Sequence, residues 1–243
     1  MVHAINNGED VVNKTNDNGG NIDSIYYRDG VNNSFSMRLL KRARMAMMNL
    51  FMEELSPGST SSILDIGVSD DENDGANFLE KHYPWQHNIT CVGLGDGKQV
   101  VSNYPKVHFK QIRAGERLPF EDQSFDIACS NAVIEHVGGP AQRTEFISEH
   151  LRVAKKVFIA FPNRWFPVEH HTGLPFLHYA PRLFRTLLNG TRYSYWTHPE
   201  NMDFLDGRSI MKDWPKSGRS PAAIVNAGVP LGLFSSNCAV IVR

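Results

Sequence analysis

The feature that most constrains this chain is a short apolar run that contains one acid and ends at a glycine. Ile63, Leu64, Asp65 and Ile66 directly precede Gly67. Burying an unpaired carboxylate among apolar side chains costs roughly several kcal/mol, so the acid needs a partner or a role. A glycine permits a tight turn at the carboxyl end of a strand, where open α/β sheets hold ligands. The pattern predicts a first strand with a ligand site at its end.

Acidic residues follow this turn. Ser69 and Glu72 have the spacing of a capping box, and Asp70 and Asp71 fall in the first turn of the helix that this spacing predicts. Such a turn would repel a pyrophosphate, and the loop has one glycine where dinucleotide-binding loops have three. A nicotinamide enzyme is therefore disfavoured, and a cationic cofactor without phosphate fits better.

Together with its later motifs, this turn resembles the class I S-adenosylmethionine-dependent methyltransferases, in particular the type 11-like domain. That family's first motif is an apolar strand running into an Asp-x-Gly turn, and its most specific later motif resembles LPFEDQSFDIACSNAVIEHV at residues 118–137. The resemblance spans Ile63 to Pro162. It implies a Rossmann-like, doubly wound α/β sheet, mostly parallel with one antiparallel strand near the C-terminus, and helices on both faces.

The resemblance also implies S-adenosyl-L-methionine as the cofactor. The residues expected to bind it are Asp65, Gly67, Ser69, Gly95, Asp96, Gly115 and Asn131. Three departures from the family pattern accompany them: Ser69 and Asp71 replace further glycines, Gly95 takes the place of the ribose-binding acid with Asp96 one residue later, and Ala114 replaces the adenine-contacting acid. A non-catalytic module that keeps the fold and binds a partner is therefore the alternative.

The spacing of apolar residues, together with glycines and prolines that end helices and strands, predicts the remaining secondary structure. Residues 1–33, rich in Asn and Gly, are expected to be flexible, and 34–243 to form the methyltransferase-like domain. The expected helices are 34–56, 76–83, 142–153 and 182–188, and the expected strands after the first are 89–94, 106–112, 125–130, 156–161, 222–229 and 237–242. The first helix carries basic residues that indicate a solvated face rather than a membrane contact, namely Arg38, Lys41, Arg42 and Arg44.

Residues 162–220 are interpreted as a lid that binds the methyl acceptor, an unidentified small molecule, sugar or lipid. The segment follows the fifth strand and begins with aromatic, histidine and proline residues in no regular period. For a hydroxyl acceptor, the candidates for taking its proton are His136, Glu169, His170 and His171. Adjacent histidines project differently and no third ligand lies at a usual spacing, so no metal site is expected. Trp165 and Tyr179 either stack on a substrate or pack the lid.

Composition limits the function classes. With 243 residues, 41% hydrophobic content and a formal charge of −1, the chain can bury a core and has no basic excess for nucleic acid. No membrane-spanning run is visible and the first residues lack the apolar core of a signal peptide, so a cytoplasmic location is expected. Cys91, Cys129 and Cys238 lie in apolar runs without metal-binding spacing and are expected to be buried thiols.

Overall fold

The computed structural model describes residues 34–70 and 76–243, so the expected flexible segment 1–33 and most of the expected capping box lie outside the described residues. Seven strands form one sheet: β1 (Ile63–Ile66), β2 (Ile89–Gly93), β3 (His108–Gln111), β4 (Phe125–Asn131), β5 (Ala154–Pro162), β6 (Ala223–Leu231) and β7 (Phe234–Val242). Their order is β3-β2-β1-β4-β5-β7-β6. Strands β1 to β5 are parallel, whereas β7 pairs antiparallel with both β5 and β6. The predicted doubly wound sheet with one antiparallel strand is confirmed.

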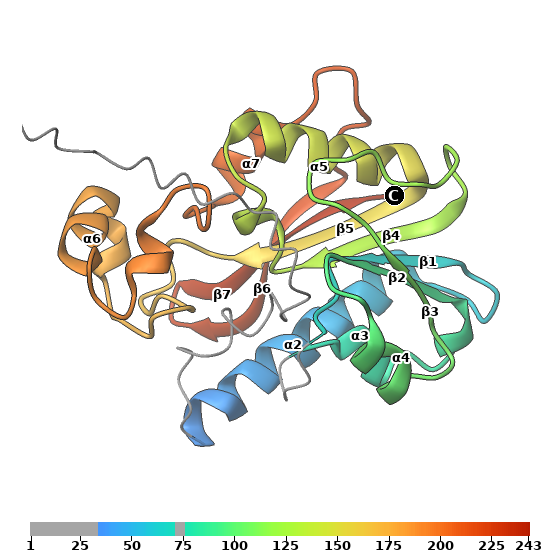
Figure 1. Cartoon of the computed structure of the whole chain (residues 1–243), viewed down its shortest axis with the longest axis horizontal. Helices are drawn as coiled ribbons and strands as arrows, with labels where there is room; N and C mark the ends of the chain where they lie inside the picture. The colour runs from blue at the N-terminus through green and yellow to red at the C-terminus, as the bar shows by residue number, and fades with distance from the viewer. Residues whose placement is uncertain (1–33, 71–75) are drawn as a thin grey trace, which may run out of the picture.

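Helices cover both faces of this sheet (Figure 1). They are α2 (Ser34–Leu55), α3 (Phe78–His82), α4 (Lys98–Asn103), α5 (Pro140–Val153), α6 (Pro181–Leu188) and α7 (Gly207–Asp213), with 3-10 turns η1 (Gln86–Asn88), η2 (Ile134–His136), η3 (Leu177–Tyr179) and η4 (Ser194–Thr197). On one face, Phe51 of α2 packs edge-on against Phe158 of β5 with ring centroids 5.6 Å apart. On the other face, Ile147 of α5 and Ile210 of α7 pack with Val240 of β7.

Three helices differ from the sequence expectation. Helix α3 begins at Phe78 rather than near Ala76, because Asn77 adopts φ 48° and uses its side-chain amide to bind the backbone of Ser69. Helix α4 was not expected, since six residues are too few to show a helical period. Helix α7 was likewise not expected, and a capping box occurs at its start, where Asp206 and Ser209 exchange hydrogen bonds.

Within the chain between β5 and β6, residues 163–222, the part around α6 extends from the sheet as a lobe (orange in Figure 1), whereas α7 packs beside α5 over the sheet. The lobe's own small core contains Phe184, Trp196 and Phe204. Arg143 of α5 fastens it to the main body: the buried guanidinium donates to Asp203 at 3.0 Å, Asp213 at 2.6 Å and the carbonyl of Gly138 at 2.9 Å. We call residues 163–222 the β5–β6 segment.

Two further sequence expectations concern burial and membranes. Cys91, Cys129 and Cys238 are buried free thiols, as predicted. Across residues 34–70 and 76–243, no helix combines the length and apolarity needed to cross a membrane.

Candidate functional site

The turn after β1 requires a glycine for two reasons. Gly67 has φ +95°, and a Cβ placed on it would lie 2.5 Å from a methyl carbon of Val133 in the turn after β4. The Gly67 amide donates to the carbonyl of Val92 on β2 at 2.8 Å, which fixes the turn between its neighbouring strands. Because β1 pairs with β2 on one side and β4 on the other, the turn lies where the strand order reverses. Ligands of doubly wound sheets bind at this switch point.

The acid of the same strand lies beneath this turn rather than in it. Asp65 occupies the register position between Cys91 of β2 and Cys129 of β4, and its carboxyl interacts with Glu80 of α3 and with Cys129. Burial raises the pKa of Asp65 well above its ordinary value, and the charge of Glu80 raises it further. Glu80 in turn accepts a hydrogen bond from the thiol of Cys91 at 3.1 Å. Asp65 is thus part of a buried carboxyl pair that joins α3 to the sheet.

The loop after β2, where the family resemblance places the ribose-binding acid, is in contact with Asp70 from the β1 turn. Asp70 from the β1 turn accepts hydrogen bonds from the amides of Gly97 at 2.9 Å and Gln99 at 3.2 Å, at the start of α4. A Cβ on Gly95 would lie 3.0 Å from the Asp70 carboxylate, so the missing side chain at Gly95 makes room for Asp70. Asp96 forms an ion pair with Lys98 on the surface. Asp70 was predicted to lie in the first turn of a helix after β1, and its contact with the start of α4 was not predicted.

Two of the remaining residues expected to bind the cofactor are Asn131 and Gly115. The amide oxygen Oδ1 of Asn131, at the carboxyl end of β4, is buried and has no hydrogen-bond partner among the described residues. A Cβ on Gly115, which has φ +76°, would meet no atom of residues 34–70 or 76–243 within 4 Å. An unpartnered buried amide oxygen at the end of β4 is consistent with a ligand-facing position.

The β5–β6 segment contributes a tight turn organised by Glu169. One carboxylate oxygen accepts from the amide and Nδ1 of His171, at 3.0 and 2.8 Å, and the other accepts from the amide and hydroxyl of Thr172, both at 2.7 Å. Burial alone would raise the pKa of Glu169, but the positive charge and hydrogen bonds of His171 hold it below its ordinary value. All four contacts lie within the turn, so Glu169 orients His171.

His171 reaches back to the turn after β4. Its Nε2 lies 3.1 Å from Nε2 of His136, and the two rings are perpendicular with centroids 4.9 Å apart. His136 Nδ1 lies 2.7 Å from the carbonyl oxygen of Asn201, a contact that requires Nδ1 to be the donor. Burial lowers the pKa of His171, but the charge of Glu169 overrides this and raises it above its ordinary value. The two Nε2 atoms therefore approach each other closely while both Nδ1 atoms are already engaged.

The residue beside His136 was not among the predicted site residues. Glu135 is only 2% exposed, and neither of its carboxylate oxygens has a hydrogen-bond partner among the described residues. One of these oxygens lies 3.8 Å from Nε2 of His136. Burial raises the pKa of Glu135 to about 7, although the charge of His171 opposes this. Its presence in the IEH sequence at residues 134–136 was the available signal.

A small cavity lies beside this cluster. It has a volume of about 20 Å³ and is lined by Glu135, Glu169, His170 and His171 together with residues of the β5–β6 segment. This is room for a water molecule or an ion rather than for a methyl acceptor. An acceptor therefore requires a movement of the β5–β6 segment or a position outside this cavity.

The other candidates of the β5–β6 segment have separate contacts. The ring of His170 packs edge-on against Phe166, with centroids 5.7 Å apart, and burial lowers the pKa of His170 to about 4. Trp165 is 46% exposed, and its Nε1 donates to Asp206 at 2.9 Å. The Tyr179 hydroxyl donates to the carbonyl of Trp165 at 2.6 Å. The structure thus brings together His136, Glu169 and His171, and leaves His170 outside their chain of hydrogen bonds.

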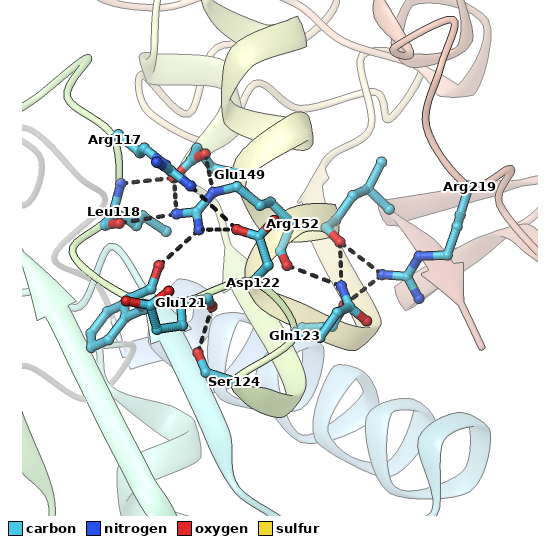
Figure 2. A network of polar contacts seen from close by, with 12 residues as sticks. Arg117, Leu118, Glu121, Asp122, Gln123, Ser124, Glu149, Arg152 and Arg219 are labelled. Atoms are coloured by element: carbon cyan, nitrogen blue, oxygen red, sulfur yellow. Dashed lines mark hydrogen bonds and ion pairs between the residues drawn. The ribbon is translucent and has the colours of Figure 1, made fainter.

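The specific LPF motif has a structural explanation (Figure 2). Arg152 of α5 donates to the carbonyls of Leu118 and Phe120, at 2.9 and 2.7 Å, and to both oxygens of Glu149 at 2.7 Å. Glu149 also accepts from the Leu118 amide at 2.7 Å, and Asp122 accepts from Arg152 at 2.8 Å. This Arg152–Glu149 network holds the loop before β4 against the end of α5.

Comparisons with known proteins agree with this architecture. The family model described as "Methyltransferase domain" matches residues 82–158. No curated protein sequence matches the chain.

Solved structures resemble the chain over most of its length. A SAM-dependent methyltransferase from Methanosarcina mazei is 16% identical, with 79% of this chain and 94% of that chain covered and a TM-score of 0.55. Magnesium protoporphyrin IX methyltransferase from Synechocystis PCC 6803, solved with bound SAH, is 13% identical over 89% and 90% of the two chains, with a TM-score of 0.54. A protein from Pyrococcus horikoshii OT3 is 14% identical over 90% and 94%, with a TM-score of 0.55. The resemblance to class I methyltransferases is confirmed in the domain match and in the fold.

Proposed function

From the methyltransferase-domain match and the shared fold, we propose that this chain is an S-adenosyl-L-methionine-dependent methyltransferase acting on a small-molecule, sugar or lipid acceptor in the cytoplasm. The observation that carries the proposal is the edge formed by β1 and β4. There the Gly67 turn brings backbone to the switch point of the sheet, and Asn131 offers a buried oxygen that has no partner among the described residues.

When bound, the cofactor supplies a methyl group that its sulfonium already activates. The protein then has to orient the acceptor in line with that methyl group and exclude water. We assign cofactor contacts to Gly67, Ser69, Gly95, Gly115 and Asn131, and to Asp96 once it releases Lys98. Asp65 supports the edge from beneath, through its contact with Glu80.

On the acceptor side we assign polar contacts to His136, His170 and His171. Glu169 acts as a positioning residue, because its carboxylate oxygens are occupied within its own turn. His171 comes from the β5–β6 segment and His136 from the turn after β4, so an acceptor bound near them would lie where the lobe meets the sheet edge.

One observation favours a second candidate, a non-catalytic protein that keeps the fold. Asp70 approaches Gly95, where the ribose-binding acid of the family would stand, and its carboxylate is already bound to the amides at the start of α4. A cofactor that reaches this position must displace or share Asp70. Direct binding measurements separate the two functions.

Calorimetric titration and thermal unfolding with S-adenosylmethionine, S-adenosylhomocysteine and NADH test the proposal. We expect both sulfur compounds to bind and raise Tm, because a ligand that binds only the folded state stabilises it. NADH should do neither. Stabilisation by NADH alone would contradict the methyltransferase assignment. Stabilisation by none of the three compounds would also contradict it and would favour the non-catalytic alternative.

A glycine substitution locates the site. Gly67→Val should lower the affinity for S-adenosylmethionine at least about 10-fold, since the new side chain collides with Val133 and β-branched residues do not tolerate this φ. Gly190→Val is the matched control, because Gly190 also has positive φ but no atom in the described part of the chain lies within 4 Å of its added Cβ. Equal affinities in the two variants would place the cofactor elsewhere.

A further inference from the structure

The His136–His171 pair has an arrangement that two histidines seldom adopt by themselves. Each ring is anchored through Nδ1, one by the carbonyl of Asn201 at 2.7 Å and the other by the carboxylate of Glu169 at 2.8 Å. With both Nδ1 atoms acting as donors, both neutral rings would direct Nε2 lone pairs at each other across 3.1 Å. That approach is repulsive unless a cation, either a proton or a metal ion, lies between the nitrogens.

The anchoring resembles the surroundings of histidines that bind metals. A metal-binding histidine usually donates its second ring N–H to a carboxylate or a backbone carbonyl, which fixes its orientation. Here His171 has the carboxylate partner, Glu169, and His136 has the carbonyl partner, Asn201. Two imidazole nitrogens bound tetrahedrally to Zn²⁺ at about 2.0 Å stand about 3.3 Å apart, close to the separation observed.

Glu135 supplies the third donor and an independent observation. Its carboxylate is buried, has no hydrogen-bond partner among the described residues, and approaches His136 Nε2 to 3.8 Å. One ligand atom from each of Glu135, His136 and His171 lies within 4.8 Å of the others. Leaving a carboxylate buried without a partner is unfavourable, and a cation beside it removes that penalty.

We propose that Glu135, His136 and His171 form a binding site for a divalent transition-metal ion of the Zn²⁺ type. Two imidazoles and one carboxylate suit such an ion better than Mg²⁺ or Ca²⁺, which take oxygen ligands. Three protein ligands leave one coordination position for water. The proposal goes beyond methyl transfer and does not depend on it.

The site would join two parts of the molecule. Glu135 and His136 belong to η2 at the end of β4, whereas His171 belongs to the β5–β6 segment. Trp196, also of that segment, packs against both imidazoles, with its ring centroid 4.6 Å from that of His171 and 5.9 Å from that of His136. Around the site, Glu135 and Glu169 contribute negative charge and Arg44 of α2 positive charge. Metal binding would therefore fasten the lobe to the sheet.

Zinc titration of the full chain tests the site. After removal of metals with a chelator and dialysis, we expect one Zn²⁺ to bind per chain with Kd below about 1 µM by calorimetry and to raise Tm, while Mg²⁺ does neither. Glu135→Gln and His171→Gln should each weaken Zn²⁺ binding at least about 100-fold. Glu169→Gln, which weakens the anchor of His171 and the turn that holds it, should weaken Zn²⁺ binding about 10- to 100-fold.

The neighbouring histidine provides the matched control. His170→Gln should bind Zn²⁺ as the wild type does, because His170 packs on Phe166 outside the cluster. Should His171→Gln be unfolded by circular dichroism, Glu135→Gln decides, since it preserves the size of the side chain. Absence of stoichiometric Zn²⁺ binding in the wild type, or equal binding in Glu135→Gln, overturns the site. Binding of S-adenosylmethionine by the metal-free protein is measured separately, so failure of one proposal is distinguishable from failure of the other.

Discussion

Two clusters of charged side chains, the Arg152–Glu149 network and the group formed by Glu135, His136 and His171, use their polar atoms in opposite ways. In the first, both oxygens of Glu149 accept hydrogen bonds from Arg152, and Arg152 also binds two backbone carbonyls (Figure 2). In the second, the oxygens of Glu135 have no hydrogen-bond partner among the described residues and two Nε2 atoms face each other. A cluster with complete hydrogen bonding holds the fold together, whereas an incomplete one is arranged to receive something else.

Removing the central arginine of the first cluster should have the largest effect. We expect Arg152→Ala to lower the free energy of unfolding by about 4 kcal/mol, because Glu149 and two carbonyls lose their partner in a largely buried place. Urea denaturation measures this. Arg117→Ala is the matched control: its contact with Asp122 is 70% exposed on the arginine side, so we expect a loss below about 0.5 kcal/mol. Similar losses in both variants would contradict a structural role specific to Arg152.

A third histidine extends the comparison through its pH dependence. His150 of α5 is fully buried, with Nδ1 donating to the Phe146 carbonyl at 2.8 Å and Nε2 accepting from Ser130 at 3.1 Å. Burial lowers its pKa from 6.5 to about 4, so the neutral ring is favoured in the folded protein. The resulting stability is fully present above pH 6.5 and is lost as the pH falls to about 4.

Comparison with His150→Gln isolates this contribution. Between pH 7 and pH 4, the free energy of unfolding of the wild type should fall by about 3 kcal/mol more than that of His150→Gln. Urea denaturation at a series of pH values provides the measurement, and the shared background of other titrating groups cancels. Parallel pH profiles for the two proteins would show that His150 titrates normally in the folded state.

The same substitution in each cluster should have effects of opposite sign and smaller size. Glu149→Gln should lower the free energy of unfolding by about 2 kcal/mol, because the amide cannot accept all the hydrogen bonds of the carboxylate. In metal-free protein at neutral pH, Glu135→Gln should leave it unchanged or raise it by up to about 1 kcal/mol, because a neutral amide is easier to bury than a carboxylate that has no hydrogen-bond partner among the described residues. A loss of comparable size in Glu135→Gln would mean that this cluster is also completed by the protein itself.

Much of the fold could be predicted from the sequence, because its strands and longer helices carry strong periodic signals. The alternation of strand-like and helix-like segments from Ile63 to Pro162 predicted the parallel strands, and the two apolar runs after residue 220 predicted β6 and β7. Local geometry was less accessible. The left-handed conformation of Asn77 and the six residues of α4 depend on contacts with the β1 turn rather than on a pattern of their own.

The candidate site shows a different limit. His170 and His171 are adjacent and were identified together, yet only His171 joins His136, because the turn held by Glu169 directs the two rings differently. Glu135 adjoins His136 but is remote from His170 and His171 in the sequence, so the spacing around the two adjacent histidines did not indicate it as a third donor. Asp65 was expected at the ligand edge from its motif, and strand alternation places its side chain on the face of Ile63, beneath α3.

The position of β7 has a consequence for how fast the chain can fold. Although β7 is the last strand in the sequence, it lies inside the sheet, between β5 and β6, and pairs Val242 with Val157. Contacts between residues so distant along the chain form slowly, because a long loop must close first. Until the β6–β7 hairpin docks, β5 presents an open edge that can pair with other chains. Refolding should therefore compete with aggregation at this step, and dilution should favour the native sheet.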